Sequence, residues 1–134
     1  MADVMPNAGV PALPELNIVR QVSANDAALP TAKNKGINCS DFDEITVTAT
    51  LLGGATAAAI ELFYWSDAKN GTPNGGFVPG ATAETLAVTA SGQRKIFRVA
   101  HSIVWFNVTA ITGGTGARVR IEVGGIPIYG RRGN

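Results

Sequence analysis

Short segments of alternating apolar and polar residues, separated by glycine-rich turns, constrain the fold of this chain more than any other feature. The clearest is EITVTATLL, in which Ile45, Val47, Ala49 and Leu51 alternate with three threonines. A period of two is typical of a strand that buries one face. Similar segments recur along the chain, and no helical period is sustained. The sequence therefore predicts an all-β protein.

Seven or eight short strands are expected. The main segments are LNIVRQVS, EITVTATLL, AAAIELFYW, ETLAVTA, RKIFRVA, IVWFNVTAI and ARVRIEVGG. AAAIELFYW tolerates a helix, but its flanking glycines and terminal aromatic residues favour a strand. GGAT and GGTG are read as turns, the second as the turn of a hairpin. This spacing predicts an antiparallel β-sandwich with a jelly-roll-like arrangement.

The first fifteen residues differ from the rest of the chain. They contain Pro6, Pro11 and Pro14 with small residues between them, and no period of 2 or 3.6 runs through them. Such a segment is read as an extended arm, which is either a disordered terminus or one that orders against a partner. We therefore divide the chain into an arm, residues 1–15, and one sandwich domain, residues 16–134, whose length suits a single core.

The composition offers little for catalysis or for charged partners. The net charge is only +1, so neither nucleic acid nor a membrane surface is an expected partner. Cys39 and His101 are the single cysteine and the single histidine, whereas a zinc site needs three or four ligands. We expect Cys39 to be a small buried residue and His101 to lie in a turn. The protein is accordingly expected to be no enzyme and to need no metal or cofactor.

The stretch WSDAKNGTPNGGF, residues 65–77, is predicted to form a long loop at one end of the sandwich. A lysine stands where a calcium loop would need oxygen ligands. Trp65, Asp67, Asn70 and Asn74 combine an aromatic ring with polar groups, as sugar-binding platforms do. These four residues are candidate contacts to a partner or a glycan, with Trp65 expected to anchor at the edge of the core.

Arginines provide a second candidate contact surface. Arg118 and Arg120 alternate with buried-type residues, so both are expected on one face of a strand. Arg94, Lys95 and Arg98 are expected on a neighbouring strand. Because the net charge is low, we interpret this surface as solvated or as a contact between subunits, rather than as a phosphate site.

The last third of the chain resembles the closing strands of small β-sandwich proteins in tailed-bacteriophage virions. The resemblance rests on RKIFRVAHSIVWFNVTAITGGTGARVRIEVGG, and ITVTATLLGGATAAAIELFYWSD is similar to the first sandwich hairpin of such proteins. It implies a capsid decoration (cement) protein without enzymatic activity. The implied partners are the major capsid protein and copies of the chain itself, as a homotrimer. The implied location is the capsid surface of the virion, after synthesis in the host cytoplasm.

Two other functions stay open from the sequence. A jelly roll with an aromatic platform is also consistent with a carbohydrate- or receptor-binding module. The virion resemblance also allows a head-fibre or neck adaptor. The three hypotheses differ in where the chain sits in an intact particle.

Overall fold

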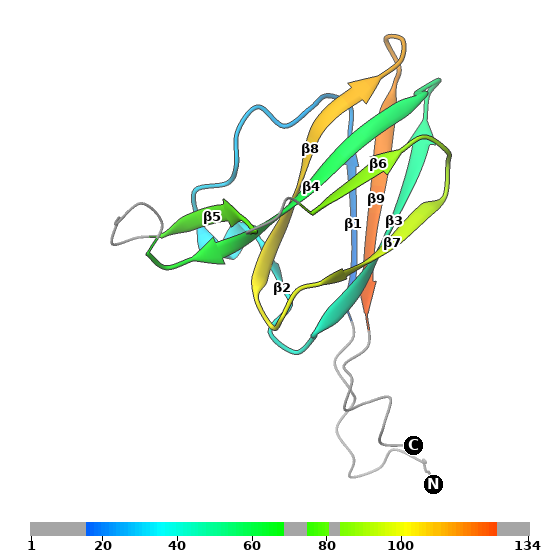
Figure 1. Ribbon diagram of the computed structural model, residues 1–134. Helices are drawn as coiled ribbons and strands as arrows, with labels where there is room; N and C mark the ends of the chain where they lie inside the picture. Colours follow the sequence, from blue (N-terminus) through cyan, green and yellow to red (C-terminus); the bar gives the residue numbers. More distant parts are fainter. Residues whose placement is uncertain (1–15, 69–74, 81–83, 126–134) are drawn as a thin grey trace, which may run out of the picture.

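The structure is a computed structural model that describes residues 16–68, 75–80 and 84–125. These residues form two antiparallel β-sheets packed face to face, which confirms the predicted all-β sandwich (Figure 1). Within them the only helical element is the short 3₁₀ turn η1 (Lys33–Lys35). Residues 1–15, with Pro6, Pro11 and Pro14, lie outside the described residues, as do residues 126–134.

Sheet I contains four strands and sheet II contains five. In spatial order, sheet I consists of β1 (Leu16–Val22), β9 (Arg118–Gly125), β3 (Glu44–Leu52) and β7 (Gln93–Arg98). Sheet II consists of β2 (Ile37–Asn38), β8 (Ile103–Thr112) and β4 (Ala57–Ser66), with β5 (Gly76–Pro79) and β6 (Thr85–Val88) both paired to β4. Every strand pair is antiparallel.

The chain changes sheet at almost every connection, which gives the sandwich a jelly-roll topology. Only β4, β5 and β6 follow one another within one sheet; every other connection crosses to the opposite sheet. The antiparallel pairs are those of a jelly roll, in which a folded-over hairpin wraps around the core. They are β1 with β9, β2 with β8, β3 with β7, and β4 with both β5 and β6. The predicted hairpin at residues 113–116 is therefore wrong, because β8 and β9 lie in different sheets.

The described part of the chain contains nine strands, where seven or eight were expected from the sequence. The two that periodicity missed are short: β2 has two residues and β5 has four. Strand β6 pairs with the first half of β4 and β5 with the second half, so together they occupy one edge position. The Leu62 N–H donates to the Glu84 carbonyl between them. Residues 65–77 are thus partly strand, since β4 continues to Ser66 and β5 begins at Gly76.

Side chains from alternate positions of both sheets fill the core. Ile45, Val47 and Ala49 of β3 are buried against Val104 and Phe106 of β8 in one cluster, as the alternation predicted. The intervening threonines of β3 face out of the sandwich. Burial of one face of each sheet holds the two layers together.

Cys39 lies in this core, fully buried, and the structure confirms that expectation. Desolvation by burial raises the pKa of its thiol from 9 to about 12. Above pH 9 the unfolded chain loses this proton while the folded chain keeps it, so stability should fall as pH rises from about 9 towards 12. Urea titrations across this range should show the loss, and Cys39→Ala should flatten the profile. An unchanged slope in that variant would contradict the assignment.

The turn between β7 and β8 contains two strained residues. Ala100 (φ 49°) and His101 (φ 60°) are both left-handed, and the Ser102 N–H donates to the Val99 carbonyl at 3.0 Å. This geometry corresponds to a type I′ turn, which favours glycine or asparagine. His101 is thus a turn residue, as predicted, and its ring Nδ1 lies 3.0 Å from the Ser40 carbonyl oxygen.

Relieving this turn should stabilise the protein. We expect Ala100→Gly to raise the free energy of unfolding by about 1 kcal/mol, because an alanine in the left-handed region is disfavoured by roughly that amount. The matched control is Ala110→Gly, at an exposed position inside β8, which should lower stability instead. Urea unfolding of both variants measures the difference. Equal destabilisation by the two would show that the turn is unstrained.

Candidate functional site

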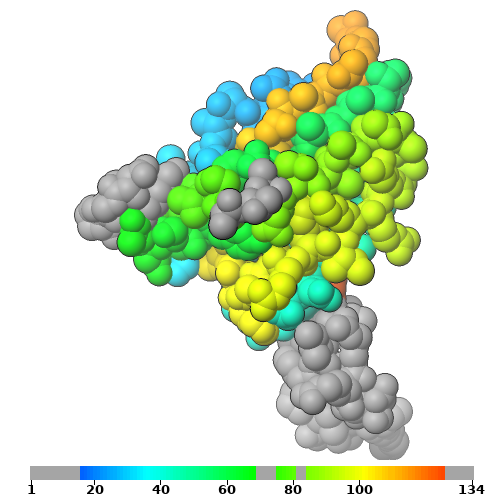
Figure 2. All heavy atoms as spheres, in the orientation of Figure 1, coloured from blue at the N-terminus to red at the C-terminus, as the bar shows by residue number. Residues whose placement is uncertain are grey.

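The two long edges of the sandwich differ in how they are closed. At the β6–β7 edge, polar side chains of β7 bridge the sheets: the Gln93 amide donates to the Ala87 carbonyl at 2.8 Å. The Lys95 ammonium donates to the Thr85 carbonyl at 2.6 Å. Strands β4, β6 and β7 lie side by side on the face shown in Figure 2 (green to yellow). This edge is sealed by direct contacts between the sheets.

Tyr64 adds a further bridge on the same side. Its phenol O–H donates to the Glu84 carboxylate, and the Arg98 carbonyl oxygen lies 3.0 Å from the phenol oxygen. Desolvation by burial, reinforced by the hydrogen bond to Glu84, raises the pKa of the Tyr64 phenol above its ordinary value. The phenol therefore remains a neutral donor throughout the physiological range.

At the opposite edge, β8 is closed by a side chain rather than by a strand. Strand β2 pairs only with Ile103 and Val104. Beyond these two residues, Asp26 provides the hydrogen-bond partners of the β8 backbone. Its N–H donates to the Val108 carbonyl at 2.8 Å, and its carboxylate accepts the Val108 N–H at 2.7 Å. The connection between β1 and β2 thus satisfies the exposed backbone of β8.

Arg20 of β1 completes this closure. Its guanidinium forms an ion pair with Asp26 and donates to the Phe106 carbonyl at 2.8 Å. It also lies over the Trp105 ring, 4.2 Å from the centroid. Arg20 and Asp26, here called the latch, join β1 of sheet I to β8 of sheet II through side-chain hydrogen bonds to the β8 backbone.

An apolar cleft remains beside the latch. This edge groove lies between β1 and residues 35–38 and has a volume of about 460 Å³. Its walls and floor are largely aliphatic and aromatic: Leu16, Ile18, Ile37, Phe106, Ile121 and Val123. Ile18 shares the inward face with these residues, since it pairs with the buried Val123, yet it is 40% exposed. The groove therefore lies at the rim of the core: Phe106, Ile121 and Val123 beneath it are almost fully buried, and Ile18 is the inward-facing side chain that stays exposed.

Strand β1 is also the less protected of the two edge strands of sheet I. Of the three large hydrophobic side chains exposed in the described part of the chain, Ile18 and Val19 lie on β1 and Ile96 lies on β7. On β7, Ile96 is flanked by charged neighbours, which discourage further strand pairing. On β1 the one charged side chain, Arg20, is held in the latch. Within the described residues, β1 therefore has no free charged side chain that would discourage further strand pairing.

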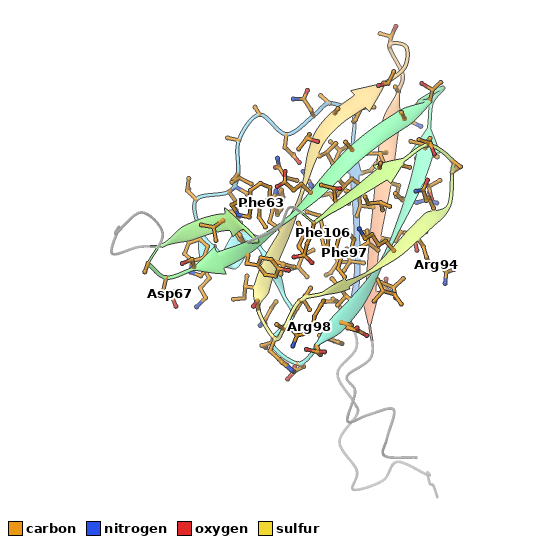
Figure 3. The ribbon with its side chains drawn as sticks, in the orientation of Figure 1. Phe63, Asp67, Arg94, Phe97, Arg98 and Phe106 are labelled. Atoms are coloured by element: carbon orange, nitrogen blue, oxygen red, sulfur yellow. The ribbon has the colours of Figure 1, made fainter. Side chains whose placement is uncertain are left out.

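The predicted arginine surface is present, with a corrected arrangement. Arg118 and Arg120 both lie on the outer face of β9, between buried residues. Arg94 and Arg98 share that outer face, and Figure 3 shows Arg94 pointing away from the sandwich. However, β3 separates β7 from β9, so the two sets are not on neighbouring strands. Lys95 is on the opposite side of β7, at the sealed edge.

Trp65 and Asp67 lie at the far end of β4, by the β4–β5 connection (Figure 3). The indole N–H of Trp65 donates to Asp67 at 2.9 Å, and its ring packs edge-on against Phe77 at 5.1 Å. Trp65 is half-buried and packs on the buried Phe77, beside rather than within the main core cluster. Asn70 and Asn74 lie outside the described residues.

Over residues 16–68, 75–80 and 84–125, no group of three or more histidine, cysteine, aspartate or glutamate side chains gathers as a metal site would require. No helix in those ranges is long and apolar enough to cross a membrane.

Sequence reasoning missed the edge groove and the latch. The available signal was the disturbed alternation in LNIVRQV, where Val19 and Arg20 depart from the simple pattern. An inward-facing arginine on an edge strand needs a buried partner. That partner, Asp26, lies in a polar loop, where an aspartate is an ordinary residue and gives no sequence signal.

Comparison with known proteins adds little. No family model matches the chain, and no curated protein matches it. Among solved structures, the SPBc2 prophage-derived protein YomS is similar at 15% sequence identity and a TM-score of 0.44, over 87% of this chain and 99% of that protein. A likeness at this level does not transfer a function.

Proposed function

We propose that this chain is a non-enzymatic structural protein of a bacteriophage particle, a decoration protein that binds the outer surface of the capsid. Two lines of reasoning support the proposal. The resemblance of residues 37–125 to virion sandwich proteins supports the phage particle, and the uncovered edge groove supports assembly with other polypeptides. A homotrimer together with the major capsid protein is the assembly that the proposal implies.

The groove is the observation that carries an assembly role. A soluble monomer rarely leaves inward-facing residues such as Ile18 beside an apolar cleft. The outer face of sheet I has by contrast a shallow, largely polar hollow that includes Thr46, Thr48 and Arg94, which suits a hydrated contact. The chain therefore has one surface that favours tight burial and another that favours a weaker polar contact.

The test is to mix the purified protein with capsids assembled from the major capsid protein of the same phage. We expect it to co-sediment with the capsids, to appear on their outer surface by cryo-electron microscopy, and to raise their melting temperature. Location at the neck or tail would favour an adaptor instead, and absence of binding would contradict the proposal.

A single variant separates this function from glycan binding. Trp65→Ala removes an aromatic ring beside the β4–β5 connection, at a residue that neither lines the edge groove nor belongs to sheet I. Capsid binding should be unaffected by this substitution. Loss of adsorption to host cells, with capsid binding intact, would support the carbohydrate-binding alternative.

A further inference from the structure

We propose that the edge groove accepts the N-terminal segment of a second copy of this chain, with residues 4–10 added as an extra strand beside β1. This contact rests on the self-association that the proposed function includes, and it is independent of capsid binding. It is a case of strand addition, in which main-chain hydrogen bonds supply affinity and side-chain pockets supply specificity.

The backbone of β1 offers the pairing surface. Among the described strands, β1 pairs with β9 on one side only, over all seven residues from Leu16 to Val22. The β8 edge opposite is already satisfied by β2 and by the latch. An added strand therefore has one open template in this region, and that template runs along the groove.

The side chains of the segment suit the groove. Val4, Pro6, Ala8 and Val10 place small apolar groups at every second position, as a strand with one buried face requires. Proline is tolerated in an edge strand where its missing N–H would face solvent. The groove presents the matching surface, because its lining is almost entirely apolar.

Charge complements this fit. Lys35 lines the groove, and no ion pair involves it within the described residues. Asp3 immediately precedes the apolar positions of the segment. The C-terminal residues 126–134 contain an apolar run as well, but they carry Arg131 and Arg132, which Lys35 would repel. The N-terminal segment is thus the better occupant of the two chain ends.

The segment is expected to enter the groove of a second copy rather than the groove of its own chain. The segment joins β1 at Leu16, which itself lines the groove, so an intramolecular strand would have to reverse direction within residues 11–15. A residue before a proline disfavours the helical conformation, so the sequence of the link, with Pro11 and Pro14, is better suited to continuing outwards than to reversing. The link from residue 10 to residue 16 spans about 20 Å when extended. Such head-to-tail contacts can close into a ring.

Cysteine cross-linking tests the contact directly. One copy carries Val10→Cys, and a second, size-tagged copy carries Ile18→Cys; the native Cys39 is fully buried and stays unreactive. Oxidation should link the two copies. The matched control is Ile96→Cys, at the sealed edge, where the original side chain is 62% exposed and no link should form. Equal linking at both positions, or none at Ile18→Cys, would overturn the proposal.

Sedimentation provides an independent readout. Deletion of residues 1–15 and the substitution Ile18→Asp should each weaken self-association at least about tenfold. Ile96→Asp should leave it unchanged. A full-length protein that stays monomeric would overturn the proposal, as would a Val10→Cys, Ile18→Cys double variant that links only within one chain. Loss of capsid binding with self-association retained would instead count against the proposed function alone.

Discussion

Asp26→Ala is expected to lower the free energy of unfolding by about 3 kcal/mol, far more than an ordinary loop substitution. The substitution leaves the Val108 N–H without its acceptor and the Arg20 guanidinium without its counter-ion. Both groups are poorly hydrated, since Val108 is fully buried and the Arg20 side chain is only 28% exposed. An unsatisfied donor and a stranded charge at such a site are each costly.

The cost should come from coupling, which a double-mutant cycle can measure. Arg20→Ala, Asp26→Ala and the double variant should show an interaction energy of about 1–2 kcal/mol in urea unfolding. Lys33→Ala is the control, because Lys33 and Asp67 lie 3.8 Å apart on the surface and are well exposed; it should cost under about 0.5 kcal/mol. Additive effects of Arg20→Ala and Asp26→Ala would show that the two side chains have no coupling free energy, and would contradict the proposed role of the latch.

The latch also offers a spectroscopic signal. Arg20 lies over the Trp105 ring, so its release should change the emission of that indole. In a Trp65→Phe background Trp105 is the remaining tryptophan. A change in emission with Asp26→Ala before global unfolding would show that the edge opens locally. We expect such opening to widen the groove, because Arg20 and Trp105 both line it.

The strands themselves could be predicted from the sequence. Alternation in EITVTATLL and ARVRIEVGG sets which residues face the core, and Ile45, Val47, Val119 and Ile121 are buried as expected. Period-two patterns work here because each sheet buries one face and leaves the other exposed. Short strands carry too few residues to show a period, so β2 and β5 were missed.

Strand order and the candidate site could not be predicted. A turn sequence such as GGTG fits a hairpin and a crossing between sheets equally well, because glycine supplies the required backbone freedom in both. The groove depends on which inward-facing residues the second sheet fails to cover, and this follows from the length of β2 rather than from any motif. The latch joins residues 20 and 26 to 106 and 108, a pairing that only the folded topology brings about.

Phe106→Ala is expected to have the largest effect, lowering the free energy of unfolding by about 4 kcal/mol. Phe106 of β8 is 2% exposed and packs edge-on against Phe97 of β7, with ring centroids 5.2 Å apart. Figure 3 shows both rings between the two sheets. Truncation removes buried area, leaves a cavity in a closely packed core and breaks an aromatic pair that joins the sheets.

Position on the sheet, rather than residue type, should determine this cost. Phe63→Ala is the matched control, because Phe63 lies on the outer face of β4 and is only half-buried; it should cost about 1 kcal/mol. Urea unfolding should show a lower midpoint for both variants at a similar m-value. Equal losses would contradict the assignment of Phe106 to the core.

Because Phe106 also forms the floor of the edge groove, Phe106→Leu should retain the fold and deepen the groove. Self-association should therefore weaken in that variant with only a modest loss of stability, which would link the core to the contact between copies.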